Sequence, residues 1–356
     1  MENSSQVKKR RGRSNLAAKR VRILEVAGLK GVSDSALECI LRNLNFSGGV
    51  NRDSVRRTYK AEFRKYGTQL ALPMADGSDD YSWSIARMDL IIPYFARLAS
   101  FFKSALEQAL HTSGRDLTII AYLDEYTAGN PLACDTRRKA WGCYVGILEC
   151  GREYLCHEAA WVPVGVLRTA VSNKVLGGVS QCVARLLRSW FCGESPRIQD
   201  HGIALELNNK PELIRLRFGR LLADGDALRG ILNWKGAGGI KSCVMCWNCF
   251  KKDHELCDDD LDLYDITHCD ISSFNLNTNE DFWENTDRLA REVDVLGVGA
   301  FENLEISTGL NYSPDGLLAD IELREHFKPA DSIRYDPMHC LIANGIANIE
   351  ICFFLC

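Results

Sequence analysis

Two long apolar runs of this chain each end in an aspartate. Asp124 closes the run at residues 117–123, and Asp224 closes a second run about a hundred residues later. Apolar runs of this length are typical of buried strands, and a carboxylate at the tip of such a strand is costly to desolvate unless a cation meets it. Two strand-end acids at one sheet edge can hold divalent ions, which take oxygen ligands. The sequence therefore predicts an α/β fold with a divalent-metal site at Asp124 and Asp224. The second run is built on Leu213, Ile214, Leu216, Phe218, Leu221 and Leu222.

Each of these acids has an acidic neighbour that competes for the same role. Glu125 follows Asp124 directly, and because side chains alternate along a strand, only one of the two can face a metal on a given sheet surface. Asp224 and Asp226 would share a face, so either could be the ligand. We favour Asp224 because it follows the apolar run directly, whereas Asp226 fits the first turn of a helix, where an acid suits the helix dipole.

The charge of the chain is divided unevenly. Its 356 residues are 46% apolar and 25% charged, which is typical of a globular protein with a substantial core. Residues 1–65 hold 16 Lys and Arg against 6 Asp and Glu, which leaves 27 against 41 for the remainder. Residues 1–22 are polar and basic, which predicts a disordered arm. The arm is either a solubilising tail or a nuclear-import and nucleic-acid-binding segment. We favour the second and expect the protein to be in the nucleus. Its basic cluster is Lys8, Lys9, Arg10, Arg11 and Arg13.

The 15 cysteines would suggest disulfides if the chain were a small secreted domain. The chain starts with the basic cluster instead of an apolar signal sequence, so reduced thiols, some of them binding metal, fit better. No apolar stretch approaches the roughly 20 residues that a membrane-spanning helix needs. We therefore expect no membrane partner.

Apolar spacing divides the first part of the chain into segments. Residues 23–66 have helical spacing interrupted by a glycine pair, which fits either a DNA-binding helix-turn-helix or an ordinary helical hairpin. Residues 67–84, with their Gly, Pro and Asp, predict a linker. Residues 84–111 predict a long helix that Pro93 kinks or starts.

The middle of the chain predicts a recognisable order of elements. Residues 117–167 predict three successive strands with short turns, residues 180–192 a helix, and the run before Asp224 a further strand. The order strand, strand, strand, helix, strand opens the RNase H-like fold, so we assign residues 85–232 to the first part of such a core, a mixed sheet with flanking helices. Residues 233–356 predict an insertion, helical around residues 281–295, and the end of the core.

A dense group of thiols lies in the insertion. Cys243, Cys246 and Cys249 are followed closely by His254 and Cys257. The CxxC spacing lets two thiolates converge on one tetrahedral ion, and thiolates with imidazole select zinc over harder cations. The alternative is a set of free, buried cysteines, which is less common beside charged residues. We predict that this group binds Zn²⁺.

Asp336 and His339 form a DxxH pair near the end of the chain. His339 can donate a ring nitrogen to a metal, and Asp336 can accept its other ring proton or bind metal itself. Alone, the pair also fits a helix-capping aspartate followed by a histidine in the core.

These pieces, in this order, resemble the DDE transposases of CACTA-like and Plavaka-like eukaryotic cut-and-paste elements, over roughly residues 85–350. The resemblance implies an RNase H-like core that binds Mg²⁺ or Mn²⁺ at Asp124 and Asp224, cleaves transposon-end DNA and transfers the strands, and it leaves a homo-oligomer open. The CxxC and the later DxxH would belong to an insertion inside the catalytic core. The motifs that carry the resemblance are Leu123-Asp124-Glu125-Tyr126, Gly129-Asn130-Pro131-Leu132, Arg138-Lys139, Leu221-Leu222-Ala223-Asp224, Ala227-Leu228, Lys235-Gly236-Ala237-Gly238-Gly239, Cys243-Val244-Met245-Cys246, Asp336-Pro337-Met338-His339 and Gly345.

The chain departs from that family at the third acid. The family has a further acid, normally Glu, in a helix after the DxxH motif, and only Glu350 follows the motif here. We therefore expect the third acid to be missing, the chain to be a C-terminally truncated copy, and the protein to bind DNA with little or no cleavage.

Two other functions compete with this one. The first is a non-catalytic, zinc-containing nucleic-acid or chromatin-binding protein on the same scaffold. The second, an unrelated cytosolic enzyme that uses Cys and His as nucleophile and base, has little support, because no cysteine stands in a nucleophile-like context.

Overall fold

The computed structural model describes residues 65–127, 139–192, 197–207 and 210–336, and divides the chain into two compact units. The first unit, Met1–Thr68 with Thr127–Arg138, lies almost entirely outside the described residues. The basic arm at residues 1–22 with its Lys8–Arg13 cluster, nearly all of the helical region at residues 23–66, and His339 lie outside them too. The second unit, Gln69–Tyr126 with Lys139–Cys356, contains nearly all of the described residues.

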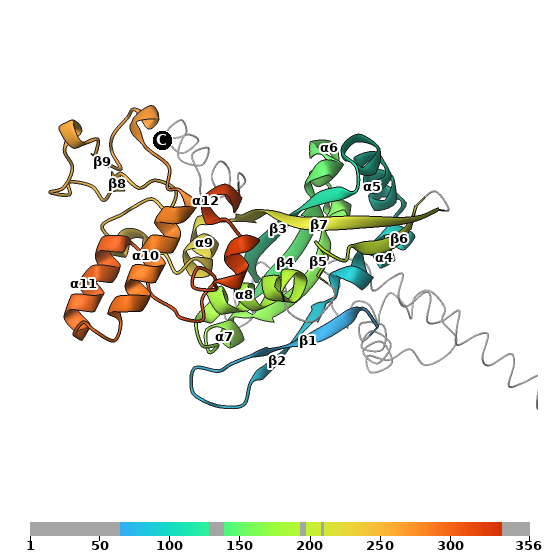
Figure 1. Cartoon of the computed structure of the whole chain (residues 1–356), viewed down its shortest axis with the longest axis horizontal. Helices are drawn as coiled ribbons and strands as arrows, with labels where there is room; N and C mark the ends of the chain where they lie inside the picture. Colours follow the sequence, from blue (N-terminus) through green and yellow to red (C-terminus); the bar gives the residue numbers. More distant parts are fainter. Residues whose placement is uncertain (1–64, 128–138, 193–196, 208–209, 337–356) are drawn as a thin grey trace, which may run out of the picture. The chain divides into compact units, whose positions relative to one another are not determined.

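The described residues form a mixed sheet of eight strands (Figure 1). Its order is β1-β2-β5-β4-β3-β7-β10, and β6 pairs with β7 beside this path. β3, β7 and β10 are mutually parallel neighbours, whereas β4 with β5 and β6 with β7 are antiparallel. The α/β class with a mixed sheet is thus confirmed. The strands are β1 (Gly67–Leu72), β2 (Tyr81–Ala86), β3 (Asp116–Thr127), β4 (Lys139–Ile147), β5 (Val162–Arg168), β6 (Ile203–Leu207), β7 (Lys210–Ala223) and β10 (Ile333–Tyr335).

Helices connect and cover these strands, and a second sheet of two short strands follows them in the chain. The helices are α4 (Met88–Leu98), α5 (Ser100–Ser113), α6 (Arg152–Leu155), α7 (Thr169–Ser172), α8 (Gly178–Phe191), α9 (Gly225–Ile231), α10 (Asn279–Glu292), α11 (Val298–Thr308) and α12 (Pro329–Ser332), and the short strands are β8 (Cys249–Phe250) and β9 (Tyr264–Asp265). None of the described helices is long and apolar enough to cross a membrane.

The segment expected to be a linker, residues 67–84, is instead most of the strand pair β1 and β2 at one edge of the sheet. Leu72 and Trp83 are buried, and the Trp83 indole N–H donates to the carbonyl of Val166 at 3.1 Å. The Gly, Pro and Asp residues that suggested a linker lie mainly in the turn between the two strands. Turn residues mark a hairpin as well as a linker, and only the pairing with the rest of the sheet separates the two.

The expected long helix at residues 84–111 is two helices, and its break is not at the proline. Pro93 lies inside α4, which continues to Leu98. The backbone becomes extended at Ala99, with φ −106° and ψ 99°, and α5 begins at the next residue. Tertiary packing thus set the break six residues beyond the position that the proline predicted.

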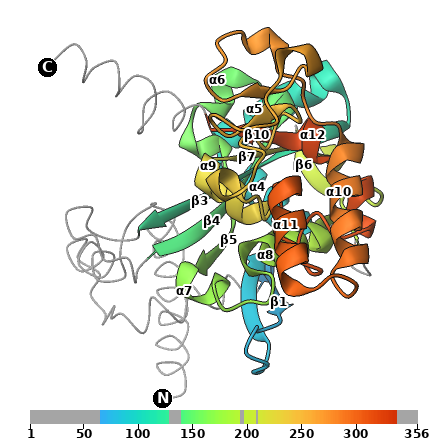
Figure 2. The same cartoon turned by 90° about the vertical axis from the view of Figure 1, so that its left-hand side faces the viewer.

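The predicted order of three strands, a helix and a strand is present as β3, β4, β5, α8 and β7, with β6 added before β7. The third of these strands, β5, starts only at Val162, because α6 and a 3₁₀ turn lie between it and β4. Helix α8 covers one face of the sheet, where the rings of Phe191 and Phe218 pack edge to face at a centroid distance of 6.1 Å. Figure 2 shows β3, β4 and β5 side by side.

Residues 236–278 differ from the sheet in having little regular structure and few buried side chains. Apart from Gly236 and Gly239, their buried residues are Val244, Asn248, Cys249 and Phe250. Hydrogen bonds from Asn248 partly compensate for the small number of buried side chains. Its side-chain amide donates to the backbone carbonyls of Asp262 and Ser273. The predicted helix around residues 281–295 is present as α10, and its Thr278 N-cap forms a capping box with Asp281.

Candidate functional site

Asp124 and Asp224 lie at the same edge of the sheet. β3 and β7 are parallel neighbours, and Tyr122 on β3 is opposite Leu222 on β7. The two aspartates each follow this pair by two residues. Because neighbouring strands are about 4.8 Å apart, the backbones of Asp124 and Asp224 are adjacent at the carboxyl ends of their strands.

A third aspartate joins them from the other side of β7. β10 runs parallel to β7 with Tyr335 opposite Ala223, so Asp336 comes level with Asp224. The backbone N–H of Asp336 donates to the carbonyl of Ala223 at 2.9 Å. Asp336 is 6% exposed, which makes it the most buried of the three acids. Three neighbouring parallel strands therefore each lead into an aspartate at the same level.

The hydroxyl of Tyr122 connects the two outer acids. It lies 3.3 Å from Oδ2 of Asp124 and 3.2 Å from Oδ2 of Asp336. Burial raises the pKa of Tyr122, and the two carboxylates raise it further, so the phenol stays protonated. Its ring packs near those of Tyr144 and Trp161, at centroid distances of 6.3 and 5.9 Å. A hydroxyl has one proton, so it donates to one carboxylate at a time. Both carboxylates lie within hydrogen-bonding distance of Tyr122, which can donate to either of them.

The middle acid, Asp224, has a defined orientation. It is the N-cap of α9, and its Oδ1 accepts the backbone N–H of Ala227 at 2.6 Å. Its second carboxylate oxygen is not used by this cap. Asp226 is in the first turn of α9 and is highly exposed, with a 3.4 Å contact to Arg229. Asp226 thus lies in the first helical turn, as the sequence predicted, and Asp224 caps the helix.

Glu125 is engaged elsewhere. Its two carboxylate oxygens accept from Lys139 Nζ at 2.7 Å and from Thr169 Oγ1 at 2.6 Å. Asp124, one residue earlier, contacts Tyr122. The two neighbours therefore have separate partners, as strand alternation predicts.

The sequence left three roles open for Asp336, a helix cap, a partner of His339 and a metal ligand, but it did not predict that Asp336 follows a strand beside Asp224. The signal was present but short: an apolar-containing strand of only three residues, Ile333–Tyr335, precedes the acid. Tyr122 was also missed, because it stands inside an apolar run. Glu350, the acid beyond the DxxH pair, lies outside the described residues.

As their side chains stand, no three His, Cys, Asp or Glu residues of the described part converge closely enough to hold a metal ion. The three carboxylates share one sheet edge, and their donor type is the one that hard cations prefer.

The thiols of the predicted zinc group lie near one another. Burial raises the pKa of Cys246 to about 12, and the charge of Cys243, a hydrogen bond between the two thiols and the charge of Cys249 add to the effect. Burial raises the pKa of Cys249 to about 11, with contributions from Cys243, Asp265 and Cys257. The backbone N–H of Met245 donates to Sγ of Cys243 at 3.4 Å. Four thiols of one short segment thus influence each other.

His254 is arranged differently from these thiols. Its Nδ1 accepts the backbone N–H of Leu256 at 3.1 Å, and its ring stacks on Phe250 at a centroid distance of 5.7 Å. A neutral imidazole that accepts at Nδ1 carries its proton on Nε2, so neither nitrogen then offers a lone pair to a metal. The structure therefore sets His254 apart from the other predicted ligands.

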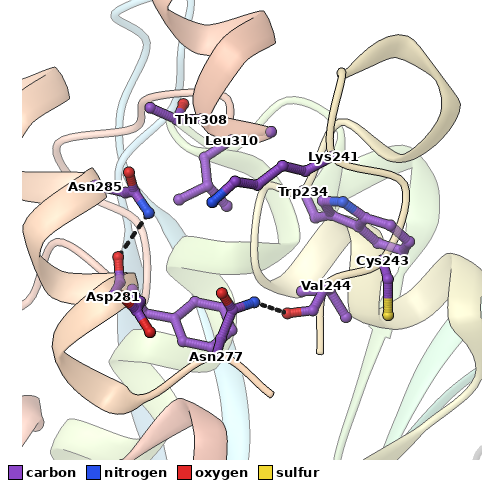
Figure 3. A pocket seen from close by; sticks show the side chains of 11 residues that line it. Trp234, Lys241, Cys243, Val244, Asn277, Asp281, Asn285, Thr308 and Leu310 are labelled. Atoms are coloured by element: carbon purple, nitrogen blue, oxygen red, sulfur yellow. Dashed lines mark hydrogen bonds between the residues drawn. The ribbon is translucent and has the colours of Figure 1, made fainter. Parts of the chain in front are cut away.

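A small cavity lies beside the thiols (Figure 3). Its volume of about 20 Å³ suits a water molecule and no organic substrate. Lys241 extends into it, and burial lowers the pKa of this lysine while the nearby Asp281 opposes the change. Asn285 and Asn277 line it as well, bonded to the backbone carbonyls of Asp281 and Val244. A second cavity, near Asn233, measures about 10 Å³. Neither is a substrate site.

No protein-family model matches the chain. No curated protein matches it significantly either.

Proposed function

We propose that this chain is a metal-dependent polynucleotidyl transferase of the DDE type, which cleaves phosphodiester bonds at the ends of a DNA element and transfers the strands. The observation that carries the proposal is the alignment of Asp124, Asp224 and Asp336 after three parallel strands, with the Tyr122 hydroxyl between the outer two. Asp336 takes the place of the acid that the sequence left missing. With it, the proposed protein is an active enzyme rather than an inert binder.

The donor set supports Mg²⁺ or Mn²⁺, because hard divalent cations take carboxylate oxygens. When bound, such ions activate a water or 3′-hydroxyl for in-line attack and stabilise the leaving oxygen. The residues of the chain fix the ligands: Ala227 orients Asp224, and Tyr122 orients Asp124 and Asp336. Cations at this edge also offset the repulsion between carboxylates held so close together.

The strand order supports an RNase H-like core. Three strands in the spatial order β5-β4-β3, then β7 and β10 parallel to β3, with α8 between β5 and β7 in sequence, is the arrangement that the RNase H-like proposal requires. In such a core the first two acids stand at the carboxyl ends of the first and fourth strands, here β3 and β7, and we propose that Asp336, after β10, serves in place of the family's helical third acid. The long segment between α9 and β10 would then be an insertion.

The test is a nicking assay on supercoiled plasmid DNA with Mg²⁺ or Mn²⁺. Asp124→Asn, Asp224→Asn and Asp336→Asn should each reduce cleavage by more than the roughly 10- to 100-fold that loss of an outer-shell partner costs. Asp226→Asn is the matched control, because Asp226 is two residues from Asp224 and highly exposed, and it should cleave normally. Normal cleavage by the Asp336→Asn variant would show that Asp336 is not the third catalytic acid. Normal cleavage by all three variants would show that this sheet edge is not the active site.

The competing function is a non-catalytic nucleic-acid or chromatin-binding protein on the same scaffold. One observation favours it: the described side chains, as they stand, form no three-ligand metal group. It predicts DNA binding without nicking in either metal. On both proposals the Lys8–Arg13 arm would contact DNA phosphates and direct the protein to the nucleus, and the sequence leaves open whether the protein works as an oligomer.

We also propose that Cys243, Cys246, Cys249 and Cys257 bind one structural Zn²⁺. The donor chemistry fits zinc, since four thiols are a common structural set. The need for an ion follows from the surroundings, because residues 236–278 bury too few side chains to form a core of their own. Small segments of this kind usually depend on a metal or disulfides.

Cobalt substitution tests this site independently of DNA cleavage. One Co²⁺ per chain with a tetrahedral thiolate absorption band is expected, and it should be lost in Cys243→Ser and Cys257→Ser. Cys269→Ser is the control, because Cys269 is an exposed cysteine of the same segment, and His254→Ala should also keep the band. A His254→Ala variant without the band would restore His254 as a ligand.

A further inference from the structure

Four arginines stand in a row beside the aspartates, and the row has no role in the site described above. Arg215, Arg217 and Arg220 are on β7, and Arg334 is on β10. We call these four residues the arginine row. Arg215, Arg217 and Arg334 are exposed and Arg220 is half-buried.

The register of the strands puts the row on one face of the sheet. On β3 the partners of Arg215, Arg217 and Arg220 are Asp116, Thr118 and Ile120, which alternate regularly and therefore share a face. Arg334 is opposite Leu222, the next β7 residue of that face. The burial pattern agrees, because the alternate β7 residues point into the core. These buried residues are Ile214, Leu216, Phe218, Leu221 and Ala223.

The row leads to the candidate site. Leu222 follows Arg220 by one step of the same face, and Asp224 follows Leu222 by another. Arg334 precedes Asp336 by two residues on the neighbouring strand. A polymer lying along this face of β7 would reach the three aspartates at its end.

The charges of the row are mostly not neutralised by acids. Arg217 donates to Thr118 Oγ1 at 3.3 Å, Arg220 to the backbone carbonyls of Gly219 and Asp331 at 3.0 Å each, and Arg334 to a backbone carbonyl. These acceptors are neutral, and no carboxylate of the described residues forms an ion pair with any of the three. Arg215 has an acidic contact, at 3.5 Å to Asp116, but both side chains are more than half exposed, so the pair is weak.

We propose that the arginine row binds the sugar-phosphate backbone of the DNA strand next to the bond that is cut. Guanidinium groups match phosphate oxygens in a bidentate geometry, and a row of them along a strand suits a repeating polyanion better than a single anion. In this role the guanidinium groups contact phosphates and not base edges, so the row holds DNA without reading its sequence. This inference rests on the proposed function, because it assigns the substrate path to the same site.

The test is DNA binding by the full chain in EDTA, measured by fluorescence anisotropy as a function of salt. Removing one phosphate contact should reduce the slope of log K against log salt by about 1 and, from counterion release alone, weaken binding about eightfold at 0.1 M salt. Arg217→Gln/Arg334→Gln should show twice the change in slope on any DNA sequence. Arg185→Gln is the matched control, because Arg185 is exposed on α8, which covers the opposite face.

The outcomes separate this inference from the proposed function. Asp124→Asn removes a negative charge beside the DNA path, so in EDTA it should bind DNA at least as tightly as the unmodified chain. If no variant nicks DNA but the row variants lose binding, the inference stands and the enzyme proposal fails. If nicking depends on Asp124 while the row variants bind with an unchanged salt slope, the inference is overturned. A row that binds RNA with the same slope and excludes DNA would overturn it as well.

Discussion

Gly219 offers a direct test of the packing that aligns the arginine row with the aspartates. It is the extra residue of a bulge in β7, because Ile119 pairs with Phe218 whereas Ile120 pairs with Arg220. A Cβ at position 219 would lie 2.0 Å from Cγ2 of Thr118, a contact that no folded structure tolerates. Thr118 is buried and β-branched, so its methyl cannot turn away freely.

Gly219→Ala should therefore destabilise the protein by about 1–3 kcal/mol, the usual cost of overpacking a core. The measurement is thermal or urea unfolding followed by circular dichroism, with a loss in Tm of about 1–2 °C for each kcal/mol. Thr118→Ser removes the clashing methyl and keeps the hydroxyl that accepts from Arg217. The double variant Thr118→Ser/Gly219→Ala should recover most of the loss.

The same substitution at Gly299 is the control, because Gly299 lies inside α11 and a Cβ there meets open space. Gly299→Ala should raise stability by about 0.5–1 kcal/mol through helix propensity. Gly219→Ala at unchanged stability, or a double variant no better than Gly219→Ala alone, would refute the clash as the reason for this glycine.

The electrostatics of the chain support three further predictions. Burial raises the pKa of Cys143 and of Cys182 to about 12, so both thiols are neutral in the folded state. Their contribution to the free energy of unfolding is full below about pH 9 and is lost as the pH rises towards 12. Unfolding measured at pH 8 and pH 11 checks this, and equal stability at both would contradict it. Hydrogen bonding by Arg324 lowers the pKa of Asp287, so its contribution is present above about pH 4 and lost as the pH falls further; Asp287→Asn should flatten the acid limb of an unfolding curve slightly, and an unchanged limb would argue against the pair. Tyr122→Phe removes the hydroxyl that both outer acids share, so it should weaken Mn²⁺ binding by about 10- to 100-fold without unfolding the chain. Electron paramagnetic resonance measures this affinity, and an unchanged value would exclude a positioning role for Tyr122.

The strands that carry Asp124 and Asp224 could be predicted because they are long. β3 and β7 have 12 and 14 residues, enough for an apolar pattern to identify a buried strand, although β3 continues to Thr127, beyond the end that the pattern predicted at Asp124. β10 has three residues, too few for any periodicity, so Asp336 could not be recognised as a strand-end acid. Its place beside Asp124 depends on pairing with β7 more than a hundred residues earlier, which local patterns do not encode.

The linker assigned to residues 67–84 failed for a related reason. β1 and β2 are short edge strands with mixed polarity, and Leu72 and Trp83 become core residues only when the edge of the sheet is built. Zinc binding by the thiols of residues 236–278 stays a prediction, since cysteine spacing gives the donor type but not the arrangement of the side chains. The contact between the Leu256 N–H and Nδ1 of His254 depends on the local turn, so it could not be predicted from that spacing.

The arginine row also shows how one residue decides which groups share a face. Arg217 and Asp224 are seven residues apart, and strict alternation along a strand puts residues at odd separations on opposite faces. The extra residue at Gly219 changes that parity, so that Arg217, Arg220 and Leu222 succeed one another along one face towards Asp224. A one-residue shift in register moves every later side chain to the other face. The basic row and the acidic edge therefore meet only through a bulge in a parallel pair, at a glycine whose missing side chain leaves room for Thr118, and no property of the arginines themselves would have predicted it.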